Sequence, residues 1–164
     1  MSSPARVEPA GTLGSITFTV YGYPEPQGSM KAFMPKGSRF PVVTSDNRSL
    51  KPWRQDVAIA ALQARNQAGI HDVSEEAVEV SVRFYFAKPK STSKRVVHKI
   101  TKPDSDKCLR AILDAMTGVL YRDDAQVIDQ HTQKRFGLPE RAEVSVSFIP
   151  ASLPVTPREP RLRA

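Results

Sequence analysis

The sequence has a single cysteine, Cys108, among 164 residues. One thiol excludes an internal disulfide and a zinc site built from several thiolates. No apolar run is long enough to span a membrane, and the first residues lack the apolar core of a signal peptide. We therefore expect a cytoplasmic protein with no membrane partner.

Acidic residues are also scarce. The chain has 17 Asp and Glu against 24 Lys and Arg, which gives a formal net charge of +7. This excess favours a polyanionic partner, nucleic acid above all, although a merely solvated basic surface would have the same composition. With 40% hydrophobic and 25% charged residues, the chain is typical of a globular protein with one domain.

Hydrophobic periodicity predicts the elements of this domain. Alternating apolar residues indicate strands at 15–21, 78–86, 127–134 and 142–149, and a hairpin built from 30–34 and 40–44. A first helix is expected from 46–49 to about Gly69, with Pro52 in its first turn, and a second over 105–117 with Gly118 as its C-cap. This order predicts an α/β or α+β fold: a single domain over 15–150 with one mixed sheet and two main helices packed on it. A flexible tail is expected at 1–14 and a basic, proline-rich tail at 151–164.

The acidic residues that stand out lie at the two ends of the second helix. Asp104 and Asp106 precede or begin it, and Asp123 and Asp124 lie in the turn that follows. Mg²⁺ prefers oxygen ligands, typically one or two carboxylates together with substrate phosphates. Helix capping and turn formation would use the same residues, although a cap needs only one carboxylate. Because a dozen helical residues span about 18 Å, the two pairs meet only if the chain doubles back, and the spacing leaves this open.

A basic segment leads directly into the first acidic pair. It runs from Lys88 to Lys102 without an acidic residue, and we expect it to form a loop. A basic approach to an acidic metal site would suit a phosphodiester backbone, although a solvated loop is the alternative. Cys108 falls on the buried stripe of the second helix, where core packing is the expected role.

Three segments in this region resemble the signature of a known family, in order and in spacing. They are Lys102-Pro103-Asp104-Ser105-Asp106, Leu113-Asp114-Ala115-Met116 and Asp123-Asp124-Ala125-Gln126-Val127. The string is similar to that of the RusA family of Holliday-junction resolvases, which are often carried by phages and prophages. The resemblance implies a homodimeric, Mg²⁺-dependent endodeoxyribonuclease, with Mn²⁺ as a substitute, that resolves four-way DNA junctions by paired symmetric nicks in recombination and repair.

The resemblance also implies roles for individual residues. Asp104, Asp106 and Asp124 match the essential acids of the family, which are catalytic and hold the metal that polarises the scissile phosphate and generates a hydroxide nucleophile. Arg110 stands where the family has Lys, and because its pKa is too high for a proton donor we assign it to stabilising charge in the transition state. Lys107 replaces the usual Asn.

The remaining assignments are less direct. Asp114 and Asp123 are possible auxiliary acids, Asp114 through a pair with Arg110 or at the edge of the site. The predicted DNA-binding residues are Lys88, Lys90, Lys94, Arg95, Lys99, Lys102 and Lys107. Two other functions stay open: a non-catalytic module that binds branched DNA and uses its acids only as helix caps, and a related nuclease that acts mainly on forks or flaps.

Overall fold

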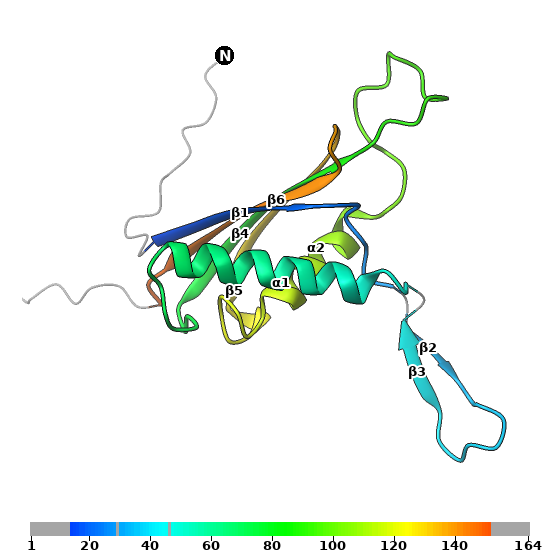
Figure 1. Ribbon diagram of the computed structural model, residues 1–164, viewed down its shortest axis with the longest axis horizontal. Coiled ribbons are helices and arrows are strands. Elements are labelled where there is room, and N and C mark those ends of the chain that lie inside the picture. Colours follow the sequence, from blue (N-terminus) through cyan, green and yellow to red (C-terminus); the bar gives the residue numbers. More distant parts are fainter. Residues whose placement is uncertain (1–13, 29, 46, 152–164) are drawn as a thin grey trace, which may run out of the picture.

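A four-stranded mixed sheet forms the centre of the computed structural model, which describes residues 14–28, 30–45 and 47–151 (Figure 1). Its strands are β1 (Gly14–Tyr21), β4 (Ala77–Phe86), β5 (Val127–Phe136) and β6 (Arg141–Ile149), in the order β1-β6-β4-β5. The pairs β1–β6 and β6–β4 are antiparallel, whereas β4–β5 is parallel. The predicted single α+β domain with a mixed sheet is therefore confirmed.

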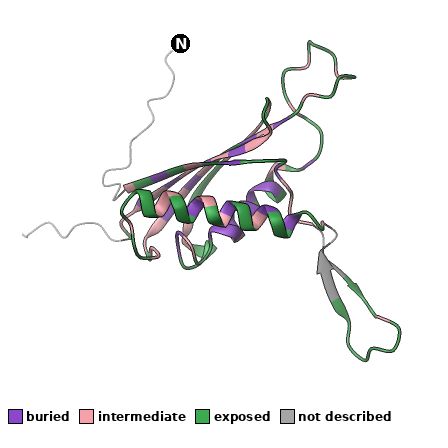
Figure 2. Cartoon of the chain, viewed as in Figure 1, coloured by how far each residue is buried: buried purple, intermediate pink, exposed green. Residues whose placement is uncertain are grey.

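Two helices supply the other half of the core, α1 (Leu50–Gln67) and α2 (Ser105–Met116). In β4 and β6 every second side chain is buried beneath the helices, for example Phe84 and Val146, while the alternate side chains are partly exposed (Figure 2). Pro52 is tolerated in α1 because the first N–H groups of a helix lack intrahelical partners. Gly69, with φ +72°, adopts the left-handed conformation that follows the end of α1.

The crossover from β4 through α2 to β5 determines where Asp123 and Asp124 lie. The chain passes from β4 through α2 to β5, and because β4 and β5 are parallel, α2 runs in the opposite direction to both. After α2 the chain turns at Gly118, whose φ is +77°, and enters β5 through a short 3-10 helix, η1 (Asp124–Gln126). The chain therefore doubles back beside α2.

Two segments extend from the end of the domain where α2 begins (Figure 1). One is the antiparallel hairpin of β2 (Met30–Phe33) and β3 (Val42–Ser45), which confirms the predicted hairpin. The other is the basic segment between β4 and α2, residues 87–103, hereafter the basic loop. The predicted tails lie outside the described residues, except that Gly14 begins β1 and Ala151 N donates to Glu76 Oε2 (2.7 Å). Within the described ranges, no helix combines the length and apolar character that crossing a membrane requires.

Candidate nuclease site

An open groove of about 730 Å³ runs along α2, and we call it the α2 groove. Its walls come from the chain just before β2, from the exposed side of α2, and from η1 with the start of β5. Five residues singled out from the sequence line it: Asp106, Lys107, Arg110, Asp114 and Asp124. Asp104 is not among the residues that line it. The two acidic segments, whose meeting the spacing left open, thus share one groove through Asp106 and Asp124.

Asp104 occupies the N-cap position of α2, but its side chain makes no capping hydrogen bond. Its carboxylate is half exposed and lies 3.6 Å from Lys107 Nζ. Asp106 follows in the first turn and is exposed. Asp104 therefore does not serve as a side-chain cap and remains accessible to a ligand.

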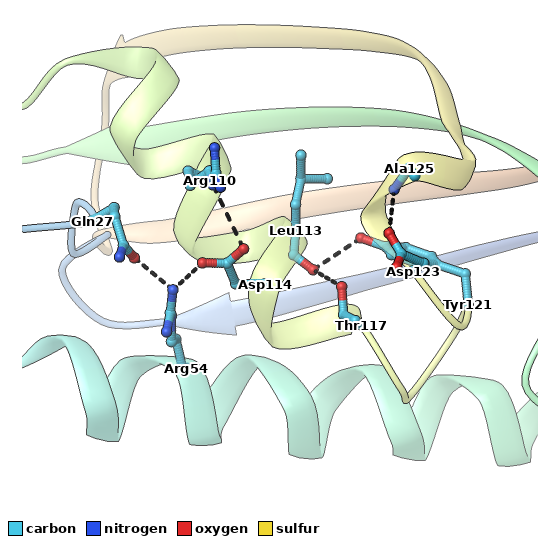
Figure 3. Close-up of polar contacts among 9 residues, drawn as sticks. All are labelled: Gln27, Arg54, Arg110, Leu113, Asp114, Thr117, Tyr121, Asp123 and Ala125. Atoms are coloured by element: carbon cyan, nitrogen blue, oxygen red, sulfur yellow. Dashed lines mark hydrogen bonds and ion pairs between the residues drawn. The ribbon is translucent and has the colours of Figure 1, made fainter.

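Asp123 and Asp124 have different environments although they are adjacent. Asp123 Oδ1 accepts from Ala125 N (2.8 Å; Figure 3). Gln126 Oε1 accepts from Asp123 N (2.9 Å), and together these contacts form a capping box. Gln126 Nε2 also donates to the carbonyls of Ser74 (3.0 Å) and Glu76 (2.8 Å). Asp123 and Gln126 hold the turn in place, and Asp124 is left exposed on the α2 groove.

Tyr121 fastens this turn to the end of α2. Its side chain is fully buried, and its hydroxyl donates to Leu113 O (3.0 Å), which also accepts from Thr117 Oγ1 (3.1 Å; Figure 3). Burial raises the pKa of Tyr121 far above its usual range, so the hydroxyl remains a donor at physiological pH. A buried anchor thereby sets the position of Asp124 relative to α2.

Asp114 lines the groove and contacts two arginines. Arg54 Nη2, from α1, pairs with Asp114 Oδ2 and donates to Gln27 Oε1 (2.5 Å), while Arg110 Nε lies 3.7 Å from Asp114 Oδ1 (Figure 3). The expected pair of Asp114 and Arg110 is therefore present. Arg54 and Gln27 were missed, because nothing in the spacing links residues so far apart in sequence. Arg110 is oriented by Asp114 and is still 64% exposed.

The basic loop uses two of its lysines to hold its own shape. Lys88 Nζ donates to Val96 O (2.7 Å), and Lys99 Nζ donates to Lys102 O (2.7 Å) while lying 4.9 Å from the centre of the Phe86 ring. Burial, together with nearby Lys134, lowers the pKa of Lys99. Lys88 and Lys99 therefore help to hold the shape of the described loop, and their contacts with DNA stay a prediction. The predicted DNA-binding residues that are exposed are Lys90, Lys94, Arg95, Lys102 and Lys107.

Lys134, on β5, is a further residue that the sequence reasoning missed. Its Nζ donates to Thr101 O (2.9 Å) and to Pro103 O (2.8 Å), directly before Asp104. In the sheet it is paired with Phe84, on the core-facing side. A lysine at an inward position of a strand was the available signal, since such an ammonium needs acceptors. Lys134 thus ties the approach to Asp104 to the sheet.

The acidic side chains suit Mg²⁺ by their chemistry, although they do not form a closed cluster. Among the described residues, no group of three or more His, Cys, Asp or Glu side chains is placed to hold a metal ion. Mg²⁺ usually takes one or two carboxylates and completes its shell with water and substrate phosphates. Asp106 and Asp124 offer exposed oxygen ligands of this kind in one groove, and the three-carboxylate site stays a prediction. Cys108 is fully buried, and burial raises the pKa of its thiol to about 12, which fits packing rather than chemistry.

The fold and the groove describe an α+β domain that brings carboxylates and a guanidinium to one open surface. The family model "Endodeoxyribonuclease RusA" matches residues 24–147. The chain is also 31% identical over 149 residues to "Uncharacterized protein YqaN" of Bacillus subtilis (strain 168), an alignment covering 85% of this chain and 100% of that protein. The chain therefore belongs to the RusA family of endodeoxyribonucleases, and the matched range contains the whole α2 groove.

Proposed function

We propose that this protein is a Mg²⁺-dependent endonuclease that resolves four-way DNA junctions by paired symmetric nicks. Family membership supports cleavage of DNA and action on branched junctions. The observation that carries the proposal is the α2 groove, where Asp106, Arg110 and Asp124 lie on one surface. We place the activity in recombination and repair in the cytoplasm.

The chain's own residues divide the work. Asp104, Asp106 and Asp124 would hold Mg²⁺ or Mn²⁺, and the bound ion supplies Lewis-acid activation of the phosphate and of a water molecule. Arg110, oriented by Asp114, donates to the phosphate oxygens as charge develops on them, and its fork can do so through two N–H groups. The exposed cations of the basic loop neutralise neighbouring phosphates.

A homodimer fits the symmetry of this substrate. A four-way junction offers two equivalent strands, and a two-fold dimer can present one α2 groove to each of them. We propose this assembly because a single groove would cut one strand and leave the junction unresolved.

Of the two alternatives, the non-catalytic module is disfavoured by the geometry of Asp104. That module requires the acids to be occupied as helix caps, and Asp104 makes no side-chain cap. A nuclease acting on forks or flaps would share the chemistry of the groove and differ only in its substrate. Substrate comparison separates it from a resolvase.

The test compares a four-way junction, a flap and a linear duplex, with Mg²⁺ and with EDTA. We expect paired nicks in the junction only when Mg²⁺ is present, and no cleavage of duplex. Asp106→Asn should abolish cleavage and keep junction binding, because it removes a metal ligand and a negative charge facing phosphate. Asp56→Asn, at an exposed position of α1, is the matched control and should cleave normally. Wild-type rates in Asp106→Asn would refute the assignment, and stronger cleavage of flaps would favour the alternative.

A further inference from the structure

The β2–β3 hairpin, residues 30–45 and hereafter the arm, exposes an apolar surface far from the core (Figure 2). The exposed fractions are 51% for Phe33, 62% for Met34, 77% for Phe40 and 44% for Val42. Phe33 and Val42 are directly paired across the two strands. An isolated two-stranded hairpin is marginal in water, and exposed apolar clusters on a monomer commonly mark an interaction site. The exposed apolar side chains of the arm therefore indicate a binding surface.

Charge selects the kind of partner. From Gln27 to Ser45 the chain carries Lys31, Lys36 and Arg39 and no acidic residue. A second copy of this chain also carries a net charge of +7, and its arm would bring the same cations into the contact. Aromatic side chains beside cations are the combination with which proteins stack on unpaired bases and neutralise the adjoining phosphates. DNA with exposed bases fits the arm better than a second copy does.

The arm starts at the wall of the α2 groove. Gln27 and Gly28 line that groove, and Gln27 N donates to Lys107 O (2.9 Å) in the first turn of α2. The base of the arm is closed on its other side by Asn47, whose Nδ2 donates to Pro26 O (3.0 Å). A DNA strand with a phosphate in the groove therefore passes the root of the arm.

The length of the arm sets which nucleotides it reaches. At about 3.3 Å per extended residue, the four residues of β2, Met30–Phe33, span roughly 13 Å, or about four base-pair steps of 3.4 Å. Phe40 lies in the turn that joins the end of β2 at Phe33 to the start of β3 at Val42. The arm contacts DNA some base pairs away from the phosphate in the groove.

We propose that the arm detects the DNA branch: its exposed aromatic side chains, Phe33 and Phe40, stack on bases left unstacked where the duplexes of a junction meet. In linear duplex every base is already stacked, so the arm gains only the electrostatic contacts of Lys36 and Arg39. At a branch it gains stacking as well, because apolar side chains can occupy an opened base step. The inference rests on the proposed function in taking branched DNA as the ligand of the α2 groove.

The test measures affinities for a four-way junction and for linear duplex in EDTA, at one salt concentration. Phe40→Ala and Phe33→Ala should each weaken junction binding by roughly 5- to 150-fold, the range typical for loss of one stacked base, and change duplex binding less than about twofold. Phe40→Trp should restore junction binding because it keeps an aromatic face. Ile59→Ala, at a 55% exposed position of α1, is the matched control and should leave both affinities unchanged.

Several outcomes would overturn the inference. One is an equal loss of affinity for junction and duplex in Phe40→Ala. Another is a difference in self-association between Phe40→Ala and the wild type, measured by sedimentation without DNA, which would show that the arm binds a second copy of the chain. If the wild type resolves junctions and Phe40→Ala keeps the junction preference, the arm inference fails and the proposed function stands. If the wild type cuts no DNA and Phe40→Ala loses the junction preference, the arm inference stands and the proposed function fails.

Discussion

Removing the ammonium group of Lys134 should disable the nuclease site without removing any residue that faces the groove. Lys134 Nζ donates to Thr101 O and Pro103 O, so Lys134→Met deletes both hydrogen bonds and keeps most of the aliphatic stem. A hydrogen bond from a charged group contributes about 1.5–3 kcal/mol, and we take the lower figure for each because the side chain is partly exposed. The expected reduction in stability is about 3 kcal/mol on this figure.

This reduction acts on the segment that carries Asp104. Displacements of about 1 Å in a catalytic arrangement can lower rates by about 10²-fold, and we expect a fall of that order in the single-turnover rate on a four-way junction. The Mg²⁺ concentration for half-maximal rate should rise, because a proposed metal ligand is misplaced. The melting temperature should fall by about 6–12 °C, at 2–4 °C per kcal/mol for a chain of this size.

The Mg²⁺ concentration that the enzyme requires shows whether Lys134 positions Asp104 or only stabilises the fold. Lys134→Arg should recover most of the rate, since a guanidinium can donate to the same carbonyls. Arg135→Met removes the neighbouring cation from the opposite side of the same strand and should leave the Mg²⁺ requirement unchanged. If Lys134→Met lowers only the melting temperature and the folded protein cleaves at the wild-type rate with the wild-type Mg²⁺ requirement, the positioning role is refuted.

Two further predictions concern the basic loop and the buried thiol. Neutralising Lys90, Lys94 and Arg95 together should reduce the slope of log affinity against log salt by about 0.9 for each phosphate that these cations neutralise in the wild type, and an unchanged slope would show that they are only solvated. The pKa of Cys108 is raised from 9.0 to about 12 by burial, so its contribution to stability is complete below pH 9 and disappears as pH rises toward 12. The difference in unfolding free energy between the wild type and Cys108→Ala should therefore shrink above pH 9, by up to about 1.4 kcal/mol per pH unit in urea titrations, and a constant difference would contradict the burial argument.

The elements of this fold were predictable because each one has a periodic sequence. The alternation from Val78 to Phe86 and the helical stripe through Cys108 and Ile112 correspond to β4 and α2. The order of the strands was not predictable, since β6 enters between β1 and β4 and such non-local pairing leaves no mark on local periodicity. Sequence reasoning therefore supplied the parts and left their arrangement open.

The site divides in the same way. Asp104, Asp106, Asp124 and Arg110 were singled out through the family signature, and their roles stay predictions. The hydrogen bonds that orient Lys88 and Lys99 were not predictable, because composition indicates the class of partner but not the direction of an individual ammonium group. The contact of Arg54 with Asp114 depends on how α1 packs against α2, which only the tertiary structure reveals.

The way the arm joins the domain has a consequence for how this protein can change. The described residues of the buried core include none from 30–45, and the two ends of the arm meet at one closed base. Substitutions, lengthening or exchange within the arm should therefore leave the free energy of unfolding of the domain nearly unaltered. Catalysis and substrate preference can then evolve independently. Substitutions in the arm can change which DNA structures the protein recognises while the residues of the α2 groove and the core stay the same.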